Sequence, residues 1–199
     1  MVRFSRYLII ILSLLTVSFA KAAFSPLSVS ILPPVQFPGE DFSITGARLS
    51  VIYGQHRDIY GFDFGLVGNI TEQDFVGTGI SGIFNWTRGN TTILGVQAAG
   101  ITNVNTSKIN VVGVQLAAIL NYNTGEGSVT GLQLALGNLG EHLNIYGIQA
   151  GIYNKAQAVY GVQIGLINYT ESLHGIQIGL VNFNHKGLFK VSPILNVGF

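Results

Sequence analysis

Cysteine is absent from this chain of 199 residues, and charged residues are scarce. Without cysteine there is no disulfide framework, thiolate metal site, catalytic thiol or lipid-modified cysteine. Only 10% of the residues are charged, against about 25% in ordinary soluble domains. The formal net charge of +1 lacks the basic excess that nucleic-acid binding requires. The composition therefore argues against nucleic acid as a partner and against a surface made for water.

Long hydrophobic runs are also missing. The longest, residues 7–19, is shorter than the roughly 20 residues of a membrane-spanning helix. Arg3 and Arg6 precede this run, and Ala20-Lys21-Ala22 follow it, as in a secretory signal with a small-residue cleavage site. Residues 1–22 are therefore predicted to be a cleaved signal peptide. The exported chain would carry seven basic residues against nine acidic ones.

Glycine, in contrast, is abundant, with 26 residues, and it marks a repeat. The motif is Gly-x-Gln-x-Gly, clearest in residues 147–154, 161–168 and 175–182. Degenerate copies extend the pattern back to Gly46, at spacings of 14 to 18 residues. Repetition at such a period is typical of proteins built by repeating one structural unit.

Each copy alternates as a β-strand does. Tyr160, Val162, Ile164 and Leu166 fall on one face, while glycine and glutamine fall on the other. Charged residues gather in the turn-like segments between copies. The pattern predicts ten strands at roughly 43–53, 57–68, 75–86, 91–102, 109–121, 127–138, 143–154, 157–168, 171–182 and 188–199.

Two all-β architectures fit these strands: an antiparallel transmembrane β-barrel with short turns, and a β-solenoid. The similarity of the copies favours the solenoid. The chain end favours the barrel, because Leu195, Val197 and Phe199 lie on one face of an alternating segment. This segment resembles the C-terminal strand of bacterial outer-membrane β-barrel proteins. The resemblance implies that these three residues are an assembly signal for the barrel-assembly machinery.

The predicted fold is therefore a barrel of about ten strands over residues 42–199, with the β-solenoid as the alternative. Residues 23–41 are expected to be a periplasmic lead-in, although 27–32 could pair as an extra strand. The repeat also resembles the bacterial surface-repeat proteins with GVQIGLIN-type copies. That resemblance implies a location in the cell envelope, at the outer membrane or cell surface, and brings no established activity.

A polar row is predicted to face the barrel lumen. It comprises Arg48, Asp63, Ser81, Gln97, Gln115, Gln133, Gln149, Gln163 and Gln177. Arg48 and Asp63 are expected to form an ion pair, since a lone buried charge is costly. The glutamines could form a hydrogen-bonded belt that fills the lumen, or line a narrow pore. Aromatic residues near strand ends are interpreted as interfacial girdles: Tyr60, Phe84, Trp86, Tyr146, Tyr153 and Tyr160.

Catalysis finds little support in the sequence. The four histidines, His56, His142, His174 and His185, have no metal-ligand spacing, and no Ser/His/Asp arrangement is convincing. No enzyme activity, metal or cofactor is expected. The favoured function is a small outer-membrane barrel with a structural or surface role, or a narrow passive pore, with outer-membrane lipid as its partner. The alternatives are a secreted or surface β-solenoid adhesin or scaffold, and a barrel enzyme.

Overall fold

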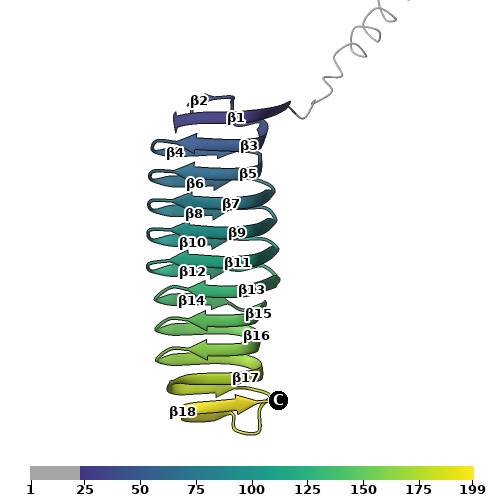
Figure 1. Ribbon diagram of the computed structural model, residues 1–199, viewed down its shortest axis with the longest axis vertical. Helices are drawn as coiled ribbons and strands as arrows, with labels where there is room; N and C mark the ends of the chain where they lie inside the picture. Colours follow the sequence, from purple (N-terminus) through teal and green to yellow (C-terminus); the bar gives the residue numbers. More distant parts are fainter. Residues whose placement is uncertain (1–22) are drawn as a thin grey trace, which may run out of the picture.

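The chain folds into a parallel β-solenoid of about ten turns, seen side-on in Figure 1. The computed structural model describes residues 23–199. Between the two ends of the rod, each strand pairs in parallel with the equivalent strand one turn further along the chain, as Gly113 does with Gly95 on one side and Gly131 on the other. An antiparallel barrel would instead pair consecutive strands. The predicted transmembrane barrel is therefore wrong, and the solenoid alternative describes the fold.

A turn of the solenoid contains one long strand and one short strand, which lie on opposite faces of the rod. The long strands are β3 (Phe42–Ser50), β5 (Asp58–Gly65), β7 (Phe75–Ser81), β9 (Thr91–Ala99), β11 (Ile109–Ala117), β13 (Gly127–Leu134) and β15 (Leu143–Ala150). The short strands are β4 (Tyr53–His56), β6 (Gly68–Thr71), β8 (Phe84–Thr87), β10 (Thr102–Asn105), β12 (Leu120–Asn123) and β14 (Gly137–Gly140). In β16 (Tyr153–Ile164) and β17 (Ile167–Asn184) a short and a long segment follow one another without a break.

The short strands explain why the sequence pattern suggested a barrel. The predicted strand at 109–121 contains the whole of β11, the turn after it and the first residues of β12. One period of 14 to 18 residues therefore closes a full turn of the solenoid instead of crossing a sheet once. The next copy then stacks directly on the previous one, so equivalent residues become neighbours.

From β5 onward, each long strand contains a glycine with a positive φ. Gly131 has a φ of +128°, a conformation that side-chain-bearing residues rarely adopt. A Cβ at this position would lie 2.1 Å from the carbonyl oxygen of Gly113 in the preceding turn. The stacked backbones therefore approach too closely for any other residue.

Antiparallel strands cover both ends of the rod. At the N-terminal end, β1 (Ala23–Leu32) pairs in parallel with β3, and β2 (Val35–Phe37) pairs antiparallel with β1. Residues 23–41 are therefore part of the solenoid and not a separate lead-in. At the other end, β18 (Val191–Gly198) pairs antiparallel with β17. Leu195 and Val197 lie in this end strand, not in a closing barrel strand, and Phe199 follows it with its side chain fully exposed.

The interior of the rod is narrow and only partly apolar. Its main aliphatic column stacks one residue per turn: Ile93, Val111, Val129, Ile145, Val159 and Leu173. Buried asparagine and glutamine side chains fill the rest of the cross-section. The predicted signal peptide, residues 1–22, lies outside the described residues. Residues 23–199 include no helix of the length and hydrophobicity needed to cross a membrane.

Candidate interaction surface and polar core

A ladder of glutamines runs through the long-strand side of the interior. From Gln115 to Gln177, each Nε2 donates to the Oε1 of the glutamine one turn earlier, at 2.7–2.8 Å, and Gln97 is the first acceptor. These side chains are buried in the described structure. At the C-terminal end, Asn196 of β18 donates to the Oε1 of Gln177 at 3.3 Å. The solenoid therefore places the six glutamines of the predicted row in one hydrogen-bonded column inside the rod.

The remaining members of the predicted row are Arg48, Asp63 and Ser81. Arg48 and Asp63 begin the same column, but Ser81 lies outside it. Arg48 pairs with Asp63, and Asp63 pairs with Gly79 instead of Ser81. A bulge between Gly77 and Gly79 then restores the register, so that Gly79 stands opposite Gln97. Ser81 lies two residues beyond the column and is buried without a hydrogen-bond partner for its hydroxyl.

An asparagine ladder, whose members are not part of the predicted polar row, runs through the short-strand side. Each side chain, from Asn69 onward, donates to the Oδ1 of the asparagine one turn later, at 2.8–3.1 Å. Its members are Asn69, Asn85, Asn103, Asn121, Asn138, Asn154, Asn168 and Asn182. The donors point opposite to those of the glutamine ladder. The asparagine at the end of each GVQIGLIN-type copy is the sequence feature from which this ladder could have been predicted.

The asparagine ladder has a defined start. Gly54 occupies the equivalent position in the preceding turn, so the Oδ1 of Asn69 is buried without a donor. A Cβ at Gly54 would lie 2.4 Å from Oγ of Ser50 and 3.0 Å from Cδ of Arg48. The ladder therefore stops where the arginine side chain takes up the interior.

Arg48 is fully buried and forms the predicted ion pair with Asp63. The pairing is bidentate, with Nε and Nη2 at 2.7 and 2.6 Å from the two carboxylate oxygens. Nη1 donates to the carbonyl of Ile70 at 2.7 Å and lies 3.4 Å from Nδ1 of His56. A buried arginine needs such partners to compensate its lost hydration. The cluster fills the N-terminal turns of the rod.

His56 completes this cluster as a neutral side chain. Its Nε2 lies 3.2 Å from the carbonyl oxygen of Pro38 and 3.1 Å from Oγ of Ser28. Burial lowers the pKa of His56 to about 4, and the positive charge of Arg48 acts in the same direction. The contacts fit a tautomer that donates from Nε2 and accepts the arginine at Nδ1.

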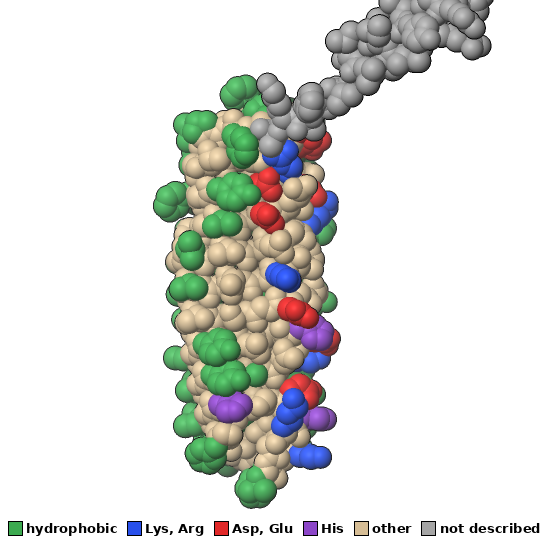
Figure 2. Space-filling view, turned by 90° about the vertical axis from the view of Figure 1, so that its right-hand side faces the viewer, with side chains coloured by type: hydrophobic (Ala, Val, Ile, Leu, Met, Phe, Trp, Pro, Cys, Tyr) green, Lys and Arg blue, Asp and Glu red, His purple; other side chains and the backbone are tan. Residues whose placement is uncertain are grey.

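The outer surface separates charge from hydrophobicity. The turns that lead from short to long strands carry charged residues, which form a band along the rod in Figure 2. Some pair across neighbouring turns, as Arg88 does with Glu72 and Lys155 with Glu141. We call this band the charged edge: Arg57, Glu72, Asp74, Arg88, Lys108, Glu126, Glu141, Lys155, Glu171 and Lys186.

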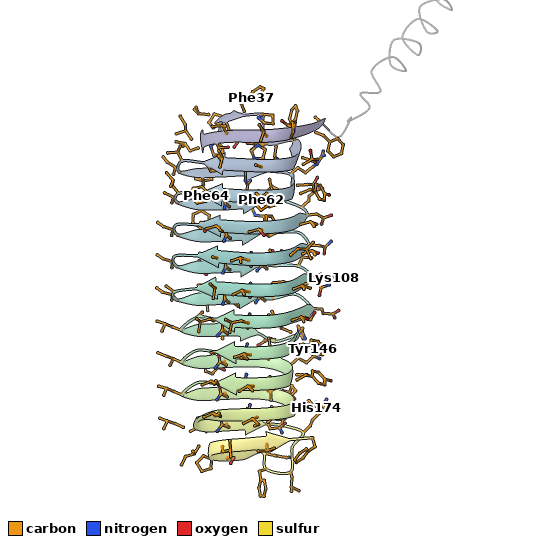
Figure 3. All side chains as sticks on the ribbon, in the orientation of Figure 1. Phe37, Phe62, Phe64, Lys108, Tyr146 and His174 are labelled. Carbon is orange, nitrogen blue, oxygen red and sulfur yellow. The ribbon has the colours of Figure 1, made fainter. Side chains whose placement is uncertain are left out.

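The opposite edge is aliphatic. It consists of the turns that lead from long to short strands, whose side chains project from the left of the rod in Figure 3. At least one exposed aliphatic side chain projects from each turn, with 40–65% of its surface exposed. We call this row the aliphatic rim: Ile52, Leu66, Ile83, Ile101, Ile119, Leu136, Ile152, Leu166 and Leu180. A parallel row on the long strands, including Phe64, Leu134 and Ile178, is also exposed.

Aromatic side chains lie between the rim and the charged edge. On the long-strand face, Tyr146 stacks on Tyr160 with ring centroids 4.8 Å apart, and Tyr160 stacks on His174 at 4.6 Å. Tyr146 and His174 are labelled towards the right of the rod in Figure 3. On the short-strand face, Trp86 lies under the guanidinium of Arg88 at 4.5 Å. Phe84 and Tyr153 lie one column nearer the rim.

A polar groove of about 800 Å³ lies beside the charged edge. Its lining comes from several consecutive turns and is rich in amides and hydroxyls, among them Thr92, Asn110, Ser128 and Asn144. Lys108 and His142 contribute the basic groups.

In the part of the chain that the structure describes, neither the interior nor the surface brings together a recognisable catalytic or metal-binding set. Of the histidines, His56 is bound up in the arginine cluster, while His142 and His185 are exposed on different turns. Within residues 23–199, no group of three or more histidine, aspartate or glutamate side chains could hold a metal ion. Comparisons with known proteins find no matching family, curated relative or similar solved structure.

Proposed function

We propose that this protein is a surface scaffold of the cell envelope, in which a rigid β-solenoid presents its long outer faces to other components. The observation that carries the proposal is the unbroken pair of amide ladders, which extends the same packing from turn to turn. About ten turns spaced by about 4.8 Å give a rod of roughly 45–50 Å. An interior built from hydrogen-bonded side chains supports the rigidity of the rod.

Two features of the sequence support the envelope location. The predicted signal peptide directs export, and the repeat resembles those of bacterial surface-repeat proteins. The exposed aliphatic rim adds a third argument, because large apolar surfaces on a folded protein mark contact sites.

The proposal is tested by the cellular location of the protein and by its accessibility on the surface of intact cells. An epitope tag inserted at Gly125, in a turn of the charged edge, should be detected by antibody on intact cells, and the protein should fractionate with the envelope. A matched chain lacking residues 2–22 should stay in the cytosol. Recovery of the complete tagged chain in the cytosol would refute the proposal.

The polar groove favours adhesion to a glycan as a second candidate function. Amide and hydroxyl side chains at regular spacing offer donors and acceptors to sugar hydroxyls. Asn110→Ala combined with Asn144→Ala should then abolish adhesion of protein-coated beads to glycan arrays, whereas Gln157→Ala, also on the groove wall, should weaken it less. Equal adhesion by all three proteins would exclude the groove.

A further inference from the structure

We propose that the rod lies edge-on in one leaflet of a lipid bilayer, with the aliphatic rim immersed in the hydrocarbon and the charged edge in water. This inference rests on the proposed surface function for its setting, but the surface of the rod itself carries the argument. The rod does not span the bilayer in this arrangement.

The shape and extent of the apolar surface point to a lipid partner. The rim follows the projecting edge of the rod in Figure 3 and continues along nine successive turns. Exposed apolar side chains flank it on both faces, with Ile164 on the long-strand side and Ile167 on the short-strand side, 42% and 41% exposed. A fluid hydrocarbon phase can cover a projecting edge and both of its flanks, whereas a rigid protein surface covers only one side.

Backbone hydrogen bonds link rim residues of neighbouring turns. In hydrocarbon, every peptide N–H and C=O must have a partner within the protein. The N–H of Ile101 donates to the carbonyl of Ile83 at 2.8 Å, and the N–H of Ile119 to that of Ile101 at 3.0 Å. Ile152 and Leu166 continue this pattern at 2.8 and 2.9 Å. These bonds run along the rod, so the groups that they join are paired within the protein and need no water.

The positions of the aromatic residues match the thickness of a leaflet. Tyr160 precedes the rim residue Leu166 by six residues, or about 20 Å of extended chain. Trp86 follows Ile83 by three residues, or about 10 Å. Half of the hydrocarbon core is about 15 Å thick, so these aromatic rings bracket the boundary where tyrosine and tryptophan prefer to lie. The charged edge then remains in water.

A second copy of the chain fits the rim less well. Two projecting rows that meet edge to edge touch along a strip about 40 Å long and one side chain wide, or roughly 250 Å² per partner. A stable protein interface needs about 800 Å² per partner. Self-association through the rim is therefore an outcome that the test must distinguish.

Flotation of purified protein with phosphatidylcholine vesicles tests the proposal. Wild-type protein should float with the vesicles, and about 0.5 M salt should not release it, because a hydrocarbon contact is not screened. Ile119→Asp combined with Leu136→Asp should reduce partitioning at least tenfold. The matched control, Leu94→Asp with Val112→Asp, also places two carboxylates on adjacent turns at similarly exposed positions, 57% and 55% exposed; it should still float.

Equal partitioning by the two variants would overturn the edge-on arrangement, as would a wild-type protein that stays with the buffer and forms dimers. Fluorescence gives a second measurement that does not rely on lost binding. Trp86 is the only tryptophan. Its fluorescence should be quenched in vesicles whose lipids carry bromines near the headgroups. In a Trp86→Phe background, the fluorescence of the tryptophan introduced by Ile119→Trp should be quenched by lipids that carry bromines deep in the acyl chains. Shallow quenching at both positions would overturn the proposal. Failure here with correct envelope localisation would leave the scaffold function standing.

Discussion

At the scale of single residues, the positive-φ glycine of the long strands is the strictest requirement of the fold. Gly131→Ala would force an alanine to a φ of +128° and place its Cβ 2.1 Å from a backbone oxygen. Strained φ and forced overpacking together cost about 3 kcal/mol or more. The free energy of unfolding in urea should fall by that amount. Gly39→Ala is the matched control, because no atom lies within 4 Å of its added Cβ. Equal stability of the two variants would contradict the close stacking at Gly131.

His56 makes stability depend on pH. Its pKa is about 4 in the folded chain and 6.5 when unfolded. Between these values the unfolded chain takes up a proton that the folded chain does not, so stability falls as the pH falls through this window. The loss reaches about 3 kcal/mol below pH 4. Urea unfolding at pH 7.5 and 4.5 measures it.

The histidine effect is isolated by comparing pH dependence between variants. His56→Gln should lose clearly less stability than wild type between the two pH values. His142→Gln, a substitution at an exposed turn residue, should follow wild type. If His56→Gln shows the wild-type pH dependence, the buried neutral histidine is not its cause.

At the scale of the elements, the glutamine ladder should tolerate no change of hydrogen-bonding character. Gln133 donates to Gln115 and accepts from Gln149, both at 2.7 Å. In Gln133→Glu at pH 7, one carboxylate oxygen would face the Oε1 of Gln115 and the donor would be lost. The Oε1 of Gln115 would then lack its donor in the ladder, and the new carboxylate would be a buried charge. Together these should lower the free energy of unfolding by about 3 kcal/mol or more.

The pH dependence of the stability lost in Gln133→Glu identifies the cause of that loss. Burial raises the pKa of the introduced carboxyl, and the protonated form can donate to Gln115. The difference in unfolding free energy between Gln133→Glu and wild type should therefore shrink at pH 4.5. Gln157→Glu, at an exposed position, should stay within about 0.5 kcal/mol of wild type. A pH-independent difference would argue against the ladder.

The sequence predicted which side chains point inward but not how the strands pair. Alternation around Gln163 assigns the interior correctly, because side-chain direction is a local property of any strand. Parallel and antiparallel strands share this alternation, so it does not identify the partner strand. The predicted row places Ser81 at the glutamine position of its turn, whereas the bulge between Gly77 and Gly79 puts Gly79 there. The rim could be recognised only once the period was known to close a turn.

At the scale of the whole molecule, the end strands limit the length of the rod. A solenoid ends in unpaired backbone groups that could pair with another chain. Here Pro26 in β1 and Pro193 in β18 each remove a backbone donor from an end strand. The C-terminal alternation that resembled a barrel strand thus belongs to a strand that closes the stack. Its antiparallel direction interrupts the parallel repeat.

Removal of β18 should therefore make the rod associate through its exposed end. A chain ending at Phe189 would leave the edge of β17 unpaired from Gly175 to Phe183, and Gln177 would lose its contact with Asn196. Because β1 and β2 still cover the other end, the truncated chain should form end-to-end dimers instead of filaments. Size-exclusion chromatography with light scattering should show twice the mass of a chain that lacks only Phe199, whose side chain is fully exposed. The same mass for both chains would show that β18 does not close the stack.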